Sequence, residues 1–235
     1  MFSNTNHRKA LVVLSGGQDS VTCLHWALEK WGPGNVEALS FSYDQRHHIE
    51  LQSAATIAKM ASIDHSILPI NTYTALGASA LVGSGGDVNG KDATNPALPA
   101  SFVPGRNLIF LTFAAAYAYQ RGIHDLITGV GQSDFSGYPD CREATLQALE
   151  GAITLGMDYE IHIHTPLMHL SKAETVRLAV DLGPEAMQAL GESHTCYNGK
   201  VPPCGDCPAC KLRAKGFAEA GIVDPLITRT MRGQQ

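Results

Sequence analysis

The chain has 235 residues, of which 44% are hydrophobic and 17% charged, with a net charge of −5 and a pI near 6.0. This composition is typical of a folded protein rather than a disordered one, and the length suffices for one sizeable domain with a small appendage. The acidic balance predicts no nucleic-acid partner, and without a long apolar segment we expect no membrane span and a cytoplasmic protein.

Short apolar runs alternate with longer segments of helical character along the chain. The predicted strands are residues 10–14, 36–43, 65–70, 126–130 and 161–165. The predicted helices are residues 20–30, 49–62, 107–121, 142–155 and 171–182. This alternation predicts an α/β fold, a doubly wound and mostly parallel five-stranded sheet with helices on both faces.

The first predicted strand runs into the hexapeptide SGGQDS, residues 15–20, and then into a helix. Glycines let a ligand approach the backbone, and the free N–H groups and dipole of a helix start favour an anion. The Asp19 carboxylate either caps the helix or helps to hold a Mg²⁺ that accompanies phosphate. The loop therefore predicts a phosphate site, with a tight turn and helix cap as the alternative.

Three further segments carry candidate anion contacts. Arg46 follows the second predicted strand, and Arg106 follows a Pro-Gly turn at a helix start, where a guanidinium could clamp a phosphate or carboxylate. An ordinary surface arginine is the alternative for Arg106. Ser171 and Glu174 predict a capping box, and Lys172 between them could reach an anion.

The loop over residues 129–142 follows the fourth predicted strand and mixes aromatic, acidic and basic side chains. Aromatic rings could stack on a flat heterocycle there, and a carboxylate could accept paired N–H groups from a guanine-like edge. A solvated loop is the alternative. The candidates are Asp134, Phe135, Tyr138, Asp140 and Arg142.

Four cysteines cluster near the C-terminus: Cys196, Cys204, Cys207 and Cys210. Four sulfurs suit a structural, tetrahedral Zn²⁺, and an iron–sulfur cluster is the alternative. A helix that starts at Pro208 carries Lys211, Arg213 and Lys215, which predict a solvated basic face.

Two boundaries follow from this layout. We expect a nucleotide-binding domain over residues 1–190 and a small zinc-binding helical region over residues 191–235 packed on it. Residues 75–101 are rich in Gly, Ala, Ser and Asn, and predict either a surface insertion or a lid that orders over ligand.

The SGGQDS hexapeptide resembles the pyrophosphate loop of the ATP-pyrophosphatase superfamily. Together with QRH, FVPGRN, TGVGQSDFSGYPDCR, TPLMHLSKAET and CYNGKVPPCGDCPAC, it makes nearly the whole chain resemble the 7-cyano-7-deazaguanine synthase family of queuosine precursor synthesis. Asp44 stands where that family often has glycine, which puts the backbone at that corner in question.

The resemblance implies an ATP-dependent ligase that makes 7-cyano-7-deazaguanine from 7-carboxy-7-deazaguanine and ammonia, by activation of the carboxylate and then of the amide. It also implies ATP, Mg²⁺, one structural Zn²⁺ per chain and a homodimer. One alternative is a tRNA-modifying enzyme of the thiolation or lysidine type, for which we would expect a basic RNA-binding domain. Another is a non-catalytic nucleotide-binding module.

The residue assignments form four groups. The candidate catalytic residues are Asp19, Arg106 and Lys172. The candidate nucleotide contacts are Leu14, Ser15, Gly16, Gly17, Gln18, Asp19, Ser20 and Gly129. The candidate deazaguanine contacts are Arg46, Asp134, Phe135, Tyr138, Asp140 and Arg142. The resemblance implies that Cys196, Cys204, Cys207 and Cys210 hold the Zn²⁺.

Overall fold

A parallel sheet forms the centre of the protein in a computed structural model that describes residues 8–43, 45, 48–70, 72, 80–82, 86–132 and 138–232. The strand order is β3-β2-β1-β4-β5, and every pairing between neighbouring strands is parallel. The strands are β1 (Ala10–Val13), β2 (Val36–Ser42), β3 (Asp64–Pro69), β4 (Asp125–Ile127) and β5 (His162–His164). The predicted doubly wound α/β fold is confirmed, with strand ends displaced by no more than a few residues.

The helices that follow the strands also lie where the sequence predicts them. They are α1 (Gln18–Trp31), α2 (Ile49–Met60), α4 (Arg106–Tyr119), α5 (Glu143–Met157) and α6 (Lys172–Asp181). Three more complete the C-terminal part: α7 (Pro184–Glu192), α8 (Pro208–Ala220) and α9 (Pro225–Arg232). Short 3-10 helices span Pro33–Asn35 and Pro139–Cys141. Sequence reasoning missed α7 and α9, which are short.

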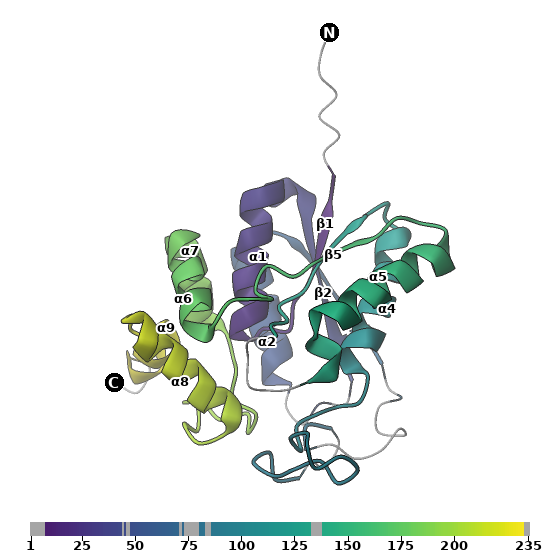
Figure 1. The fold of residues 1–235 in the computed structure, drawn as a ribbon. Helices are drawn as coiled ribbons and strands as arrows, with labels where there is room; N and C mark the ends of the chain where they lie inside the picture. The colour runs from purple at the N-terminus through teal and green to yellow at the C-terminus, as the bar shows by residue number, and fades with distance from the viewer. Residues whose placement is uncertain are drawn as a thin grey trace.

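Alternate residues of the strands bury opposite faces of the sheet. Ala10 and Val12 of β1 pack with α1 and α2, whereas Leu11 packs with α4. Both faces are therefore covered, as expected for a parallel sheet whose central strand β1 is apolar throughout. Figure 1 shows α4 and α5 on one side of the sheet and α1 on the other.

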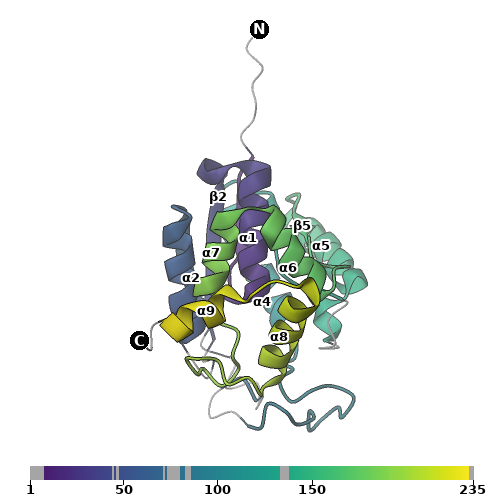
Figure 2. The ribbon, with the colours of Figure 1, turned by 90° about the vertical axis from the view of Figure 1, so that its left-hand side faces the viewer.

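The C-terminal helices add an outer layer to the α1 side of the molecule. Helices α6 and α7 contact α1, helix α8 packs on α6, and α9 packs on α7. Figure 2 shows α8 and α9 next to the ends of α6 and α7. The division of the chain at residue 190 stays a prediction.

The strand order reverses direction at β1, which has β2 on one side and β4 on the other. In doubly wound sheets, ligands bind at the carboxyl ends of the strands on either side of such a switch point. The loops that follow β1 and β4 are thus the expected borders of a site.

The segment predicted as a lid lies partly outside the described residues. Its described part contains antiparallel bridges between Gln45 and Val82 and between Lys91 and Pro99. The Asp92 carboxylate accepts hydrogen bonds from the backbone N–H groups of Thr94 and Asn95, which forms a local turn. Closure of this segment over a ligand stays a prediction.

A helix that crosses a membrane must be long and apolar. Among the residues described, no helix combines the length and the apolar character needed to cross a bilayer.

Helix α8 lies so close to α6 that Gly216 has no room for a side chain. A Cβ at position 216 would lie 2.7 Å from the Cβ of Lys172 and 3.1 Å from its carbonyl carbon. Because α6 begins at Lys172, this contact helps to set where the Lys172 side chain starts.

We expect Gly216→Ala to lower the free energy of unfolding by about 1–3 kcal/mol, because the methyl group would overpack the α6–α8 contact. Gly151→Ala in α5 is the matched control, since a Cβ there meets nothing within 4 Å. The control should raise stability by about 0.5–1 kcal/mol through helix propensity alone. Urea unfolding of both variants measures the difference, and equal stabilisation by both would contradict the close contact.

Candidate functional site

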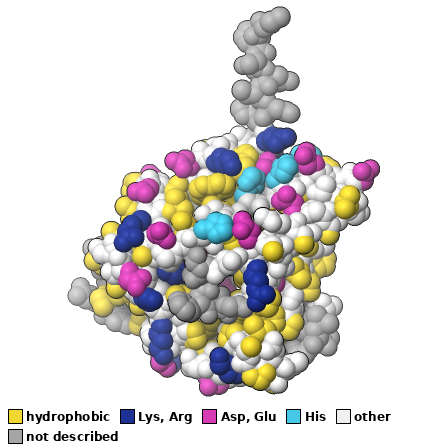
Figure 3. Space-filling model, viewed as in Figure 1, with side chains coloured by type: hydrophobic (Ala, Val, Ile, Leu, Met, Phe, Trp, Pro, Cys, Tyr) yellow, Lys and Arg dark blue, Asp and Glu magenta, His cyan; other side chains and the backbone are white. Residues whose placement is uncertain are grey.

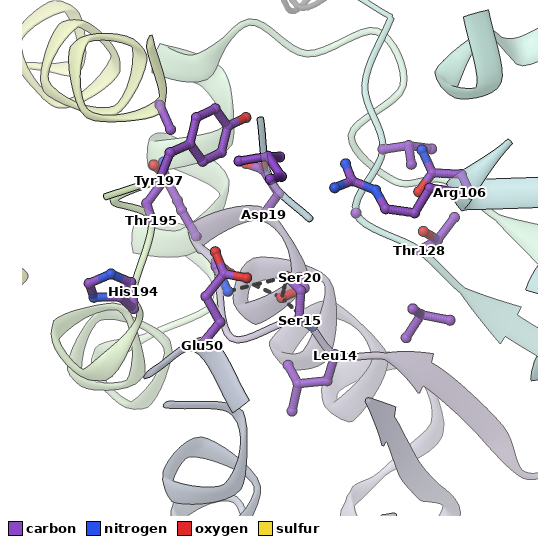
Figure 4. A pocket seen from close by; sticks show the side chains of 18 of the residues that line it. Leu14, Ser15, Asp19, Ser20, Glu50, Arg106, Thr128, His194, Thr195 and Tyr197 are labelled. Atoms are coloured by element: carbon purple, nitrogen blue, oxygen red, sulfur yellow. Dashed lines mark hydrogen bonds between the residues drawn. The ribbon is translucent and has the colours of Figure 1, made fainter. Parts of the chain in front are cut away.

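A cavity of about 300 Å³ opens at the carboxyl ends of β1 and β4. Its walls come from the loop after β1, the first turn of α2, the starts of α4 and α6, the loop after β4 and the segment 194–197. Figure 4 shows these elements converging on one space. The cavity therefore lies at the switch point of the sheet.

The glycine loop after β1 is held in a defined shape by its own serines. Ser20 Oγ donates to Gly17 O at 3.0 Å, and Ser15 N donates to Ser20 Oγ at 3.2 Å. Gly17 is the N-cap of α1 and no side chain caps the helix. The first N–H groups of α1 are thus available to an anion, as predicted for a phosphate site.

Gly16 allows α2 to approach this loop. Its φ is 86°, in the left-handed region, and a Cβ at this position would collide with the Glu50 carbonyl oxygen and lie 2.9 Å from Ala54 N. A side chain at position 16 is therefore excluded on both backbone and steric grounds. On its other side, Gly16 O accepts a hydrogen bond from His194 N at 2.9 Å.

The Asp19 side chain pairs with Lys172 instead of capping α1. Lys172 Nζ donates to Asp19 Oδ2 at 2.6 Å, across 153 residues of sequence. The predicted capping box of Ser171 and Glu174 is confirmed, and it places Lys172 in the first turn of α6. Two of the candidate catalytic residues are thus brought together by the fold.

Two buried polar atoms of the glycine loop lack hydrogen-bond partners within the described part of the chain. They are Gln18 Nε2, a donor, and Asp19 Oδ1, an acceptor. Both residues line the cavity. Because buried polar atoms are nearly always paired in native proteins, this donor and acceptor fit an anionic ligand that arrives with a cation.

Gly129 serves the packing of the site. A Cβ at this position would lie 2.8 Å from Asp19 C and from Ser20 N. The loop after β4 therefore rests directly on the first turn of α1, and Gly129 also lines the cavity. Leu14 lines it from the end of β1.

Arg106 is the first residue of α4 and lines the cavity opposite the glycine loop (Figure 4). Its Nη1 donates to Tyr43 Oη at 3.4 Å. The side chain is thus part of the cavity wall rather than an ordinary surface arginine.

The candidate residues that the structure describes in loop 129–142 differ in their burial and in whether they line the cavity. Tyr138 lines the cavity, and its hydroxyl is 2.7 Å from Ser101 Oγ. Asp140 is buried and accepts a hydrogen bond from Asn107 N at 2.9 Å, so its charge stabilises the start of α4. Arg142 is exposed. Substrate roles for these three residues stay predictions.

Three further candidates lie outside the described residues. They are Arg46, Asp134 and Phe135. Their assignment to the heterocycle remains a prediction from the sequence.

Glu50 is a cavity residue that sequence reasoning missed. It lines the cavity from the first turn of α2, where burial raises the pKa of its carboxyl from 4.5 to about 7, against the opposing effect of Arg106. In the sequence this glutamate looks like an exposed residue whose charge interacts favourably with the helix dipole. No signal therefore indicated a place in the cavity. Thr195 and Tyr197 also line the cavity and were missed.

The four clustered cysteines form one group, with all Sγ atoms within 4.8 Å of one another. The Cys204 sulfur accepts hydrogen bonds from the backbone N–H groups of Asp206 and Cys207, at 3.5 and 3.4 Å. Such bonds favour the thiolate form. Four sulfurs at these separations could hold one metal ion in a tetrahedral arrangement.

Arg213 corrects the prediction of a solvated basic face on α8. The residue is 4% exposed, and its Nε and Nη2 donate to the two carboxylate oxygens of Asp224 at 2.7 and 2.9 Å. Nη1 donates to Ser193 Oγ and Thr195 Oγ1, and Nη2 also donates to Leu190 O. A sequence pattern cannot show this, because the partners come from other elements.

Comparison with known proteins points to one family. A family model described as queuosine biosynthesis protein QueC matches residues 9–221. The 7-cyano-7-deazaguanine synthase of Chromobacterium violaceum is 59% identical over 228 residues, which cover 97% of this chain and 97% of that protein. The synthase of Laribacter hongkongensis is 60% identical over 97% of this chain and 98% of its own. That of Clostridium botulinum is 51% identical over 91% and 96%.

We expect Arg213→Met to lower the free energy of unfolding by about 3–5 kcal/mol, because Asp224 would keep a buried charge without its partner. Lys215→Met on the same helix is the control and should change stability by less than about 0.5 kcal/mol, since Lys215 is exposed. Thermal and urea unfolding measure both. Equal small effects would show that the Arg213–Asp224 pair is not a buried structural contact.

Proposed function

The chain belongs to the family of queuosine biosynthesis protein QueC, and we propose on this premise that it converts 7-carboxy-7-deazaguanine and ammonia to 7-cyano-7-deazaguanine with ATP. The observation that carries the proposal is the cavity itself. It has a glycine loop at a helix start on one side and Arg106 on the other, so one space offers sites for phosphate and for a carboxylate.

The chemistry explains why the reaction needs ATP. A carboxylate oxygen is a poor leaving group, so the acid must be activated before ammonia can displace that oxygen. The product of this displacement is a primary amide, whose oxygen must also leave to give a nitrile. Two successive activations at one cavity fit a chain with a single glycine loop.

The protein contributes position and charge to these steps. The N–H groups at the start of α1 bind phosphate oxygens, and Lys172 adds a positive charge whose place is set by Asp19. Arg106 holds the substrate carboxylate against the phosphate that activates it.

The donor sets fit both metal ions that the family resemblance implies. Asp19 Oδ1, buried and without a hydrogen-bond partner in the described residues, would hold a Mg²⁺ that neutralises phosphate charge. The four cysteines would hold a structural Zn²⁺, with no position left open for catalysis.

One face of the molecule carries side chains of both charges. On the face shown in Figure 3, Lys and Arg side chains of the described residues lie among Asp and Glu side chains. An RNA-binding face would instead collect basic side chains into a stripe or patch. The homodimer that the family resemblance implies stays a prediction.

We expect Asp19→Asn to lower the rate of nitrile formation by at least about a hundredfold, because the variant removes the charge that holds Lys172 and the cation. The exposed Asp181→Asn, at the end of α6, should retain wild-type activity. The assay incubates protein with ATP, ammonia and the carboxylate substrate and identifies products by mass. A wild-type protein that forms neither amide nor nitrile would contradict the proposed function.

We expect the purified protein to contain about one zinc per chain, bound by four sulfurs. Cys207→Ser should lose the metal and melt at a lower temperature, because metal binding contributes to folding free energy. Cys23→Ala, which changes a buried cysteine of α1, should keep its zinc. Elemental analysis that finds iron, with visible absorption, would contradict the zinc assignment.

A further inference from the structure

Glu50 has a defined place in the cavity that the proposed mechanism does not use. The first turn of α2 packs directly against the glycine loop, because Gly16 has no side chain to separate them. From there the Glu50 side chain points into the cavity, on the same side as Ser15 and Ser20 (Figure 4). Its carboxylate therefore lies near the place where phosphate would bind.

The carboxylate is unpaired in the described part of the chain, where it has no hydrogen-bond or salt-bridge partner. Arg106 is the positive group whose charge acts on it, and the phenols of Tyr43 and Tyr197 are the other titratable groups that it influences. Burial raises the pKa of Glu50 to about 7. A glutamate kept in such a position lowers stability when it is ionised, which is typical of functional sites.

The charge of Glu50 selects its ligand. A carboxylate repels phosphate and the substrate carboxylate, so its ligand must be a cation or a hydrogen-bond donor. Among the described residues, Glu50 belongs to no group of three or more His, Cys, Asp or Glu side chains that could hold a metal ion. Tyr43 and Tyr197 line the same cavity, and aromatic rings attract small cations.

We propose that Glu50 binds the ammonium ion and accepts the proton whose loss makes it a nucleophile. This inference rests on the proposed function, in which ammonia is a substrate. At neutral pH nearly all ammonia is ammonium, which has no lone pair with which to attack. A carboxylate beside the activated acid therefore supplies a base that takes a proton from ammonium, which the glycine loop and Arg106 do not supply.

The proton and electron movements balance. One N–H bond of ammonium breaks, its proton moves to a carboxylate oxygen of Glu50, and its electron pair remains on nitrogen. The nitrogen then forms a bond to the carbonyl carbon, and the bond between that carbon and the activating group breaks, with the electron pair leaving on that group. A second nitrogen proton passes to solvent, which leaves a neutral amide.

The test compares two nucleophiles in wild type and Glu50→Gln. Ammonia must lose a proton before it attacks, whereas hydroxylamine is already neutral at the same pH. We expect Glu50→Gln to slow amide and nitrile formation from ammonia by at least about a hundredfold near neutral pH. Hydroxamate formation from hydroxylamine should stay within about threefold of wild type, because activation of the acid is intact.

The pH profile gives a second readout. With Glu50→Gln the ammonia reaction should rise in proportion to free ammonia as the pH increases, because the variant cannot deprotonate ammonium. In wild type this dependence should flatten above pH 7, where Glu50 is ionised. Parallel profiles in the two proteins would overturn the proposal.

Glu185→Gln is the matched control, because Glu185 also lies in the first turn of a helix, α7, and is exposed. It should react with both nucleophiles as wild type does. An equal loss of rate with ammonia and hydroxylamine in Glu50→Gln would show that Glu50 acts on the acid, the metal or the nucleotide, and would overturn the proposal. An unchanged rate with ammonia would also overturn it. Absence of both products in wild type would instead contradict the proposed function.

A stability measurement shows that the variant is folded and that the carboxylate is unpaired. The folded state binds the Glu50 proton more tightly than the unfolded state, so wild type loses stability as the pH rises from 4.5 to about 7. Glu50→Gln lacks this loss and should be more stable than wild type above pH 7 and similar below pH 4.5. A variant that is less stable above pH 7 would show that native partners stabilise the charge, and would overturn the proposal.

Discussion

The buried guanidinium of Arg213 holds one wall of the cavity in place. All five of its N–H donors are used, two on Asp224 and the others on Ser193 Oγ, Thr195 Oγ1 and Leu190 O. These bonds join α8, the end of α7 and the segment that leads to the cysteines. From this segment His194 N donates to Gly16 O, so the glycine loop depends on a contact with a residue 178 positions later in the chain.

The glycine loop is held on its other side by α2. Gly16 lets the first turn of α2 approach, and this approach brings the Glu50 side chain into the cavity. Close backbone packing therefore has a chemical consequence, because it places a carboxylate near a loop suited to anions. Burial raises the pKa of this carboxyl to about 7, so its ionised form costs stability, which supports the role that we propose for it.

Much of the fold was predictable because its signals are local. The apolar runs over residues 10–14 and 36–43 predicted β1 and β2, and the Ser171–Glu174 capping box predicted the start of α6. The missed helices α7 and α9 are only 9 and 8 residues long, so each shows the sequence pattern of little more than two turns. In the sequence Arg213 looked like one of several exposed basic residues. Its acceptors belong to residues 11 to 23 positions away, and only the folded chain brings them to the guanidinium.

The sequence by itself determined the parallel α/β architecture, the loop suited to phosphate and the four-cysteine set, because each depends on residues that are neighbours in the chain. Only the tertiary structure decided that Lys172 pairs with Asp19, that Asp140 supports the start of α4 and that Glu50 faces the cavity. The physical reason is that charge and burial act through space. A carboxylate looks the same in the sequence whether the folded protein surrounds it with water, a helix start or a cavity wall. The packing of distant elements decides which of these environments it has.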